Sequence, residues 1–181
     1  MTGSASTLLR MRFLVVVLAV LAAPAVASET CIEVPYGSAE TIEQSEIAAL
    51  YAEVSIALDR FPSLATTVAT RSPELCFSSQ MDNAQGYFDV DENRIYVSRE
   101  TANDLKLGVL LHEIRHLDQF AVGACPSDDL SMGEYALATF ALEADASAIS
   151  LLIAWDMKEQ GNPRAWSALS LSLIHISEPT R

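Results

Sequence analysis

Apolar residues recur at intervals of three and four in three long stretches of the chain, and this is the period of a helix with one buried face. The stretches cover residues 41–59, about 101–120 and 131–160. Proline or glycine follows the first and third stretches, where a helix would end. The pattern therefore predicts three long helices, and we expect Thr101 or Asn103 to cap the second.

Between the first two helices the period changes to two, which is typical of strands. Residues 86–90 and 94–98 alternate apolar and polar positions around residues 91–93, and this combination predicts a β-hairpin. Residues 75–77 form a short apolar run that we interpret as a further strand, and residues 63–72 fit a short helix. The expected fold class is α+β, with a mostly helical domain and a small antiparallel hairpin beside the second long helix.

The N-terminal 27 residues have the three parts of a secretory signal peptide. Arg10 and Arg12 precede an apolar run over residues 13–23, and residues 25–27 supply an Ala-x-Ala cleavage site. The run is shorter than a transmembrane helix requires. We therefore expect a signal peptide over residues 1–27, a secreted or periplasmic location, and no stable membrane insertion after cleavage.

The last segment, residues 171–181, resembles the conceptual translation of a sequencing adapter. This resemblance implies a non-native tail and a natural chain that is truncated near Ser170. The expected domain then spans residues 28–170, and His175 is left out of the search for ligands, as for any foreign segment.

The chain is strongly acidic, with a net charge of −13 at pH 7. A surface of this sign lacks the basic patch that nucleic acids require, so nucleic acid is excluded as a partner. Three cysteines, Cys31, Cys76 and Cys125, lie in the part that we expect to be exported. Export favours a disulfide, but all three pairings stay open, as does the oligomeric state.

The second long helix contains an H-E-x-x-H motif over residues 112–116. Histidines four residues apart are offset by roughly 40° around an α-helix, so both rings can face one ion. Neutral imidazoles suit Zn²⁺, and a neighbouring carboxylate can take a proton from water that the ion acidifies. The motif therefore predicts His112 and His116 as zinc ligands and Glu113 as general base, with Gln119 on the same helix face as His116. The expected packing stripe of this helix is Leu107, Leu110, Leu111, Ile114 and Leu117.

A zinc site of a hydrolase requires a third protein ligand and a fourth position for water. With His175 set aside, no further histidine remains, so we expect a carboxylate from the third long helix. Glu143 is favoured because small residues around it would let two helix backbones approach closely, and Asp145 and Glu134 stay as alternatives. The expected buried stripe of this helix is Tyr135, Ala138, Leu142, Ala146, Ile149 and Ile153.

The H-E-x-x-H helix, followed by a helix with Glu143 in an E-A-D-A setting, resembles gluzincin-type zinc metallopeptidases. More narrowly, about half of the chain is similar to an uncharacterised bacterial family of metallopeptidase domains. The resemblance implies a zincin-like domain in which His112, His116 and Glu143 bind zinc and Glu113 is the base. Many gluzincins have an aspartate four residues after the ligand glutamate, where it steadies a histidine. This chain has Ser147 there, so the groups that support the ligands stay unassigned.

Motif and resemblance together lead us to expect a zinc metallopeptidase that hydrolyses a peptide or protein substrate. The hairpin edge beside the motif would offer main-chain hydrogen bonds to an extended peptide. Two alternatives belong to other classes: a non-catalytic helical domain that uses the same metal for stability or binding, and a metal-free helical binding domain. Bound metal would exclude the metal-free binding domain. Peptide hydrolysis would then distinguish the metallopeptidase from the non-catalytic metal-stabilised domain.

Overall fold

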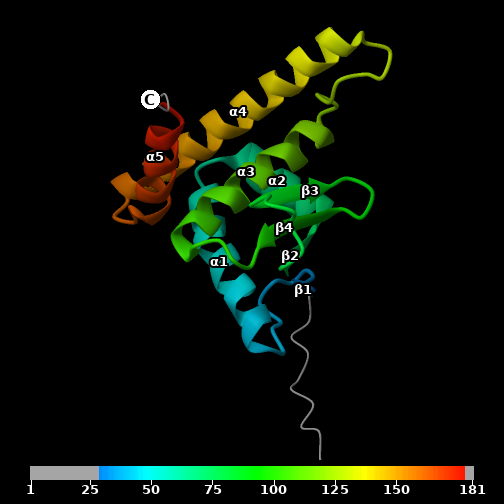
Figure 1. Ribbon diagram of the computed structural model, residues 1–181. Coiled ribbons are helices and arrows are strands. Elements are labelled where there is room, and N and C mark those ends of the chain that lie inside the picture. Colours follow the sequence, from blue (N-terminus) through cyan, green and yellow to red (C-terminus); the bar gives the residue numbers. More distant parts are fainter. Residues whose placement is uncertain (1–28, 178–181) are drawn as a thin grey trace, which may run out of the picture.

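The computed structural model describes residues 29–177 of the chain (Figure 1). Within them, helices and strands follow in the order β1-α1-α2-β2-β3-β4-α3-α4-α5. Helices combine with one small sheet, so the fold class is α+β, as the sequence predicts. The predicted signal peptide, residues 1–27, lies outside the described residues, and the boundaries at residues 27 and 170 stay predictions.

The sheet is larger than the predicted hairpin. It contains β1 (Glu29–Ile32), β2 (Glu74–Ser78), β3 (Gly86–Asp89) and β4 (Arg94–Ser98), in the spatial order β1-β2-β4-β3. The hairpin of β3 and β4 is confirmed, but β4 also pairs in parallel with β2, which pairs antiparallel with β1. Within residues 29–177, strand β3 is consequently an edge strand that pairs with β4 alone.

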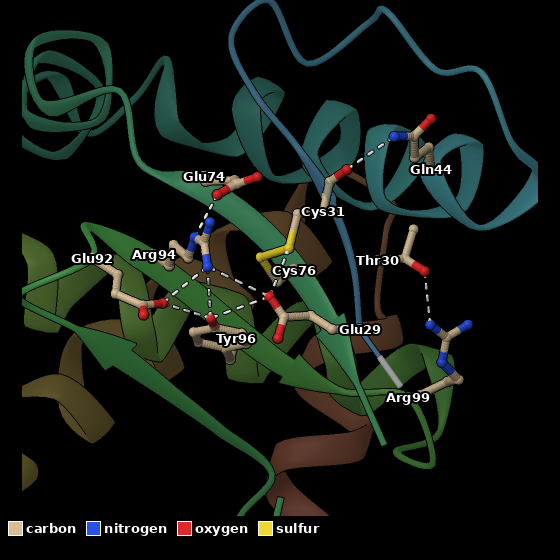
Figure 2. The surroundings of a disulfide bond; sticks show 10 residues. All are labelled: Glu29, Thr30, Cys31, Gln44, Glu74, Cys76, Glu92, Arg94, Tyr96 and Arg99. Atoms are coloured by element: carbon tan, nitrogen blue, oxygen red, sulfur yellow. Dashed lines mark hydrogen bonds and ion pairs between the residues drawn. A yellow bond between two sulfur atoms is a disulfide. The ribbon is translucent and has the colours of Figure 1, made fainter. Parts of the chain in front are cut away.

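A disulfide joins Cys31 of β1 to Cys76 of β2, two residues that face each other in the antiparallel register (Figure 2). Cys125 is a free, exposed cysteine. The structure thereby selects one of the three pairings that the sequence leaves open. Beside the disulfide, Arg94 of β4 lies 3.7 Å from the carboxylate of Glu29, so charge as well as covalent bonding links the strands.

Two helices precede the metal motif. Helix α1 (Ile42–Leu58) begins with a capping box, in which the Thr41 side chain accepts a hydrogen bond from the Gln44 backbone and the Gln44 side chain accepts one in return. The Gln44 amide also donates to the Cys31 carbonyl at 3.0 Å and so ties α1 to β1. Helix α2 (Pro62–Arg71) begins at a proline, whose fixed φ suits the first helical position.

Helix α3 (Asn103–Ala121) lies at the centre of the fold and contacts all other helices as well as β3 and β4. The predicted packing stripe is confirmed, because each of its residues is at most 1% exposed. The prediction of its N-cap is wrong, since Ala102 occupies that position and has no side-chain acceptor. Asn103 instead accepts a hydrogen bond from the Lys106 ammonium at 3.2 Å.

Helix α4 (Met132–Glu159) is buried only in its C-terminal part, where it packs on α3, α1 and α5 (Arg164–Ser177). Its N-terminal part projects from the body of the molecule (Figure 1). We call residues 132–142 the free half of α4. Tyr135, which the sequence places in the buried stripe, is 42% exposed there, because the helix extends beyond the elements that could cover it.

By length and composition alone, α4 is the one helix among residues 29–177 that could cross a membrane, with a mean hydropathy of 1.6 over its most apolar window. Core helices of soluble proteins and signal sequences can have the same length and apolar composition. Only 17% of this apolar stretch of α4 is buried, in keeping with the exposure of the free half.

Candidate metal centre

Three side chains meet where α4 crosses α3. Nε2 of His112 lies 3.0 Å from Nε2 of His116 and 3.3 Å from a carboxylate oxygen of Glu143. The other Glu143 oxygen lies 3.5 Å from Nε2 of His116. Because the two histidines are one turn apart on α3, their rings share a face, and the packing of α4 against α3 brings Glu143 to the same point.

This donor set fits a divalent metal ion. The three residues offer one ligand atom each, and these atoms all lie within 4.8 Å of one another. Burial lowers the pKa of His112, and the neighbouring His116 lowers it further, although Glu143 acts in the opposite direction. A lowered pKa favours the neutral form of the His112 ring, which is the form that binds metal. Two imidazole nitrogens and one carboxylate are ligands that suit Zn²⁺.

The other two candidate carboxylates of α4 are engaged elsewhere. Asp145 accepts a hydrogen bond from Nε of Arg115 at 2.7 Å, and this ion pair lowers its pKa. Glu134 completes the capping box of α4 by accepting a hydrogen bond from the Ser131 backbone N–H at 3.0 Å. Neither belongs to the cluster of potential ligand atoms, so Glu143 is the carboxylate of α4 that the fold brings to the histidines.

Glu113, the residue after His112 on α3, is buried and only 6% exposed. Burial raises its pKa to about 8, the charge of Glu143 contributes in the same direction, and a hydrogen bond from the Phe88 backbone partly offsets them. A cation beside Glu113 would favour its ionised form. The carboxyl group is thus poised to exchange a proton near neutral pH.

Close contact between α3 and the hairpin depends on Gly86, the first residue of β3. A Cβ atom at this position would lie 3.0 Å from the Tyr96 carbonyl oxygen and 3.0 Å from Oε1 of Glu113, and it would overlap Val109. The missing side chain therefore allows β3 to lie directly beside Glu113. A glycine within a strand often marks a place where another element packs closely, so Gly86 in the predicted strand is the sequence signal for the contact between β3 and α3.

Two cavities of about 350 Å³ each flank the centre and share Gly86, His112 and Glu113 as walls. One lies beside the edge strand β3 and is also lined by His116 and Glu143. The other has mostly apolar walls from α3, α4 and α5. Its apolar side chains are Leu105, Val109, Leu151 and Leu169.

The sequence did not predict that Gln119 forms a hydrogen bond with His116. Gln119 is 2% exposed, its side-chain oxygen lies 2.8 Å from Nδ1 of His116, and its amide nitrogen contacts α4. Its place three residues after His116, on the same helix face, is the only signal in the sequence that points to such a contact.

Comparison with known proteins is consistent with this centre. Residues 22–174 match a family described as "Putative metallopeptidase family (DUF6782)". No curated protein and no solved structure gives a significant match. A metallopeptidase requires a bound metal ion, and His112, His116 and Glu143 supply donors of the kind such an ion needs. Since the match covers most of the chain, the protein belongs to this "Putative metallopeptidase family (DUF6782)".

Proposed function

We propose that the protein is an exported zinc-dependent peptidase, in which His112, His116 and Glu143 bind the ion and Glu113 is the general base. One observation carries the proposal: two imidazole nitrogens and a carboxylate from a second helix converge beside a buried carboxyl group. A structural zinc site would be expected to fill its fourth position with protein, whereas this centre borders two cavities.

Bound zinc would lower the pKa of a water molecule toward neutrality and polarise the carbonyl of the scissile bond. Glu113 would take the proton of that water and pass it to the nitrogen of the leaving amine. The burial of Glu113 supports this role, because a base that must also act as an acid works best with a pKa near the working pH.

The surroundings support a peptide as substrate. Among residues 29–177, no further strand pairs with the outer side of β3, so a peptide in extended conformation can add to it through main-chain hydrogen bonds beside the Phe88 backbone group that donates to Glu113. The cavity on the other side of Glu113 has apolar walls and suits an apolar side chain next to the scissile bond. Both features lie within reach of the same carboxyl group, because Gly86 brings β3 against Glu113.

The test is the substitution Glu113→Gln, which keeps the shape of the side chain and removes its basicity. We expect the variant to bind zinc with the affinity of the wild type and to lose hydrolysis of a mixed peptide library by a factor of about 10² to 10⁴. Metal content is measured by elemental analysis after dialysis, and hydrolysis by mass spectrometry. Full hydrolysis by the zinc-loaded variant would remove Glu113 from the mechanism. Zinc binding by the wild type without any hydrolysis would favour a non-catalytic metal-stabilised domain.

A further inference from the structure

We infer that Gln119 is the positioning residue of the centre: it selects the metal-binding form of His116 and fastens that ring to the helix of the third ligand. This inference deepens the proposed metal site and rests on it. Gln119 is 2% exposed, and its carbonyl oxygen lies 2.8 Å from Nδ1 of His116, on the ring side opposite the ligand cluster.

The orientation of the Gln119 amide follows from its other partners. Its nitrogen lies 2.9 Å from the backbone oxygen of Leu142 and 2.8 Å from Oδ2 of Asp145. A carbonyl oxygen can only accept a hydrogen bond, so the group that faces Leu142 must be the NH₂. The carbonyl oxygen of the amide therefore faces His116, and the reverse orientation would set two acceptors against each other.

This orientation determines the form of the His116 ring. The Gln119 oxygen accepts a hydrogen bond, so Nδ1 of His116 must carry the proton. In a neutral ring the lone pair is then on Nε2, the nitrogen that lies 3.0 Å from Nε2 of His112 and 3.5 Å from Glu143. The hydrogen bond thus presents the lone pair to the metal before any ion arrives, which is the usual task of a group behind a ligand histidine.

The same amide connects the two helices that supply the ligands. Gln119 belongs to α3, and its partner Leu142 immediately precedes Glu143 on α4. Asp145, the second acceptor, is held in turn by Arg115, which also pairs with Asp118. A movement of the α4 backbone at Glu143 away from α3 would therefore have to break the hydrogen bonds of a buried amide.

This arrangement also accounts for the departure at Ser147. Where the resemblance would place an aspartate that steadies a histidine, this chain has a serine that lines the apolar cavity. The support of His116 comes instead from α3 itself, one turn beyond the histidine.

Two substitutions of Gln119 separate positioning from simple packing. Gln119→Leu keeps the approximate volume and removes all three hydrogen bonds, whereas Gln119→Glu keeps an oxygen toward Nδ1 and removes the donor toward Leu142 and Asp145. Thr67→Val is the matched control, because it removes the hydrogen bond of Thr67 to Asp118 (2.6 Å) at the outer end of the same network.

The first readout is zinc affinity, measured by competition with a chromogenic chelator. We expect Gln119→Leu to bind zinc about 10–100-fold more weakly, Gln119→Glu to recover part of that loss, and Thr67→Val to resemble the wild type. Zinc affinity in Gln119→Leu within twofold of the wild-type value would overturn the inference.

The second readout is the imidazole ¹⁵N spectrum of the zinc-free protein, which reports the tautomer without any activity. We expect His116 to carry its proton on Nδ1 in the wild type and in Gln119→Glu, and to become a mixture of tautomers in Gln119→Leu. An Nε2-protonated His116 in the wild type would overturn the inference even if the protein hydrolyses peptides. A protein that shows these tautomers and zinc affinities but no hydrolysis would refute the proposed function and leave the role of Gln119 standing.

Discussion

The carboxylate of Glu143 lies 3.3 Å from Nε2 of His112, although the two residues belong to different helices. This contact distinguishes Glu143 from the other acidic candidates of α4. Asp145 is paired with Arg115, and Glu134 caps its own helix at Ser131. The relationship rests on how α4 crosses α3, and it leads to a direct test of the third ligand.

We expect Glu143→Gln to weaken zinc binding by at least about tenfold, because it removes the negative charge and the carboxylate donor from the centre. Glu134→Gln is the matched control on the same helix, since glutamine at the third helical position preserves a capping box. Zinc content after dialysis against a weak chelator measures the difference. Equal zinc retention by the two variants would exclude Glu143 as a ligand.

The pKa of Glu113 predicts how the stability of the zinc-free protein depends on pH. Folding raises this pKa from 4.5 to about 8, so between these values the folded chain holds a proton that the unfolded chain releases. The contribution of Glu113 to stability is therefore complete below pH 4.5 and is lost as the pH rises to 8.

The measurement for this prediction is urea unfolding of the wild type and of Glu113→Gln at several pH values, with a chelator present. The free energy of unfolding of the wild type should fall relative to that of the variant as the pH rises, by at most about 1.4 kcal/mol per pH unit. The difference between the two proteins isolates Glu113 from His112, whose lowered pKa acts in the opposite sense. Parallel pH profiles would show that the Glu113 carboxyl is not protonated in the folded chain.

Gly86→Ala should destabilise the protein by about 1–3 kcal/mol, because the added methyl group meets a backbone oxygen of Tyr96 and the side chains of Val109 and Glu113. Gly133→Ala is the control, since a Cβ atom at that position would have no neighbour within 4 Å. Alanine favours a helix over glycine by about 1 kcal/mol, so this substitution should not destabilise the protein. Thermal unfolding compares the two substitutions. Equal stability of Gly86→Ala and the wild type would show that β3 does not approach α3 closely.

Reduction of the disulfide between Cys31 and Cys76 should lower the free energy of unfolding by about 2–4 kcal/mol, because the bond closes a loop in the unfolded chain. Substitution of both cysteines by serine should have the same effect, whereas Cys125→Ser should leave stability unchanged. Urea unfolding with and without a reductant measures these changes. A loss of stability with Cys125→Ser, but not with the double substitution, would contradict the observed pairing.

Elements defined by local periodicity were predictable from the sequence. The three long helices and the hairpin of residues 86–98 follow from the spacing of apolar residues, because each repeats over several turns or alternations. The parallel pairing of β2 with β4 was not predictable. The two strands are separated in the sequence by β3, so their pairing leaves no local pattern of apolar residues. Tyr135 was placed in a buried stripe because periodicity reports which face is apolar, not whether another element covers it.

Part of the candidate site was likewise predictable from local sequence, and part depended on the packing of helices. The shared face of His112 and His116 follows from the helical repeat alone. The choice of Glu143 over its neighbours required the crossing of α3 and α4, which brings one carboxylate to the rings and the other to Arg115. The contact of Gln119 with His116 depends on the orientation of a buried amide, and that orientation is set by the Leu142 carbonyl of another helix.

The free half of α4 has a consequence for hydrogen exchange. Its backbone is held mainly by its own helical bonds, and an uncovered helix of this length opens readily from its end. Such opening, once it passes Leu142, would withdraw Glu143 from the histidines. Amide protons of residues 132–142 should therefore exchange quickly in the empty protein and slowly when a cation holds Glu143, so that occupancy of the centre can be followed in a part of α4 that supplies no ligand.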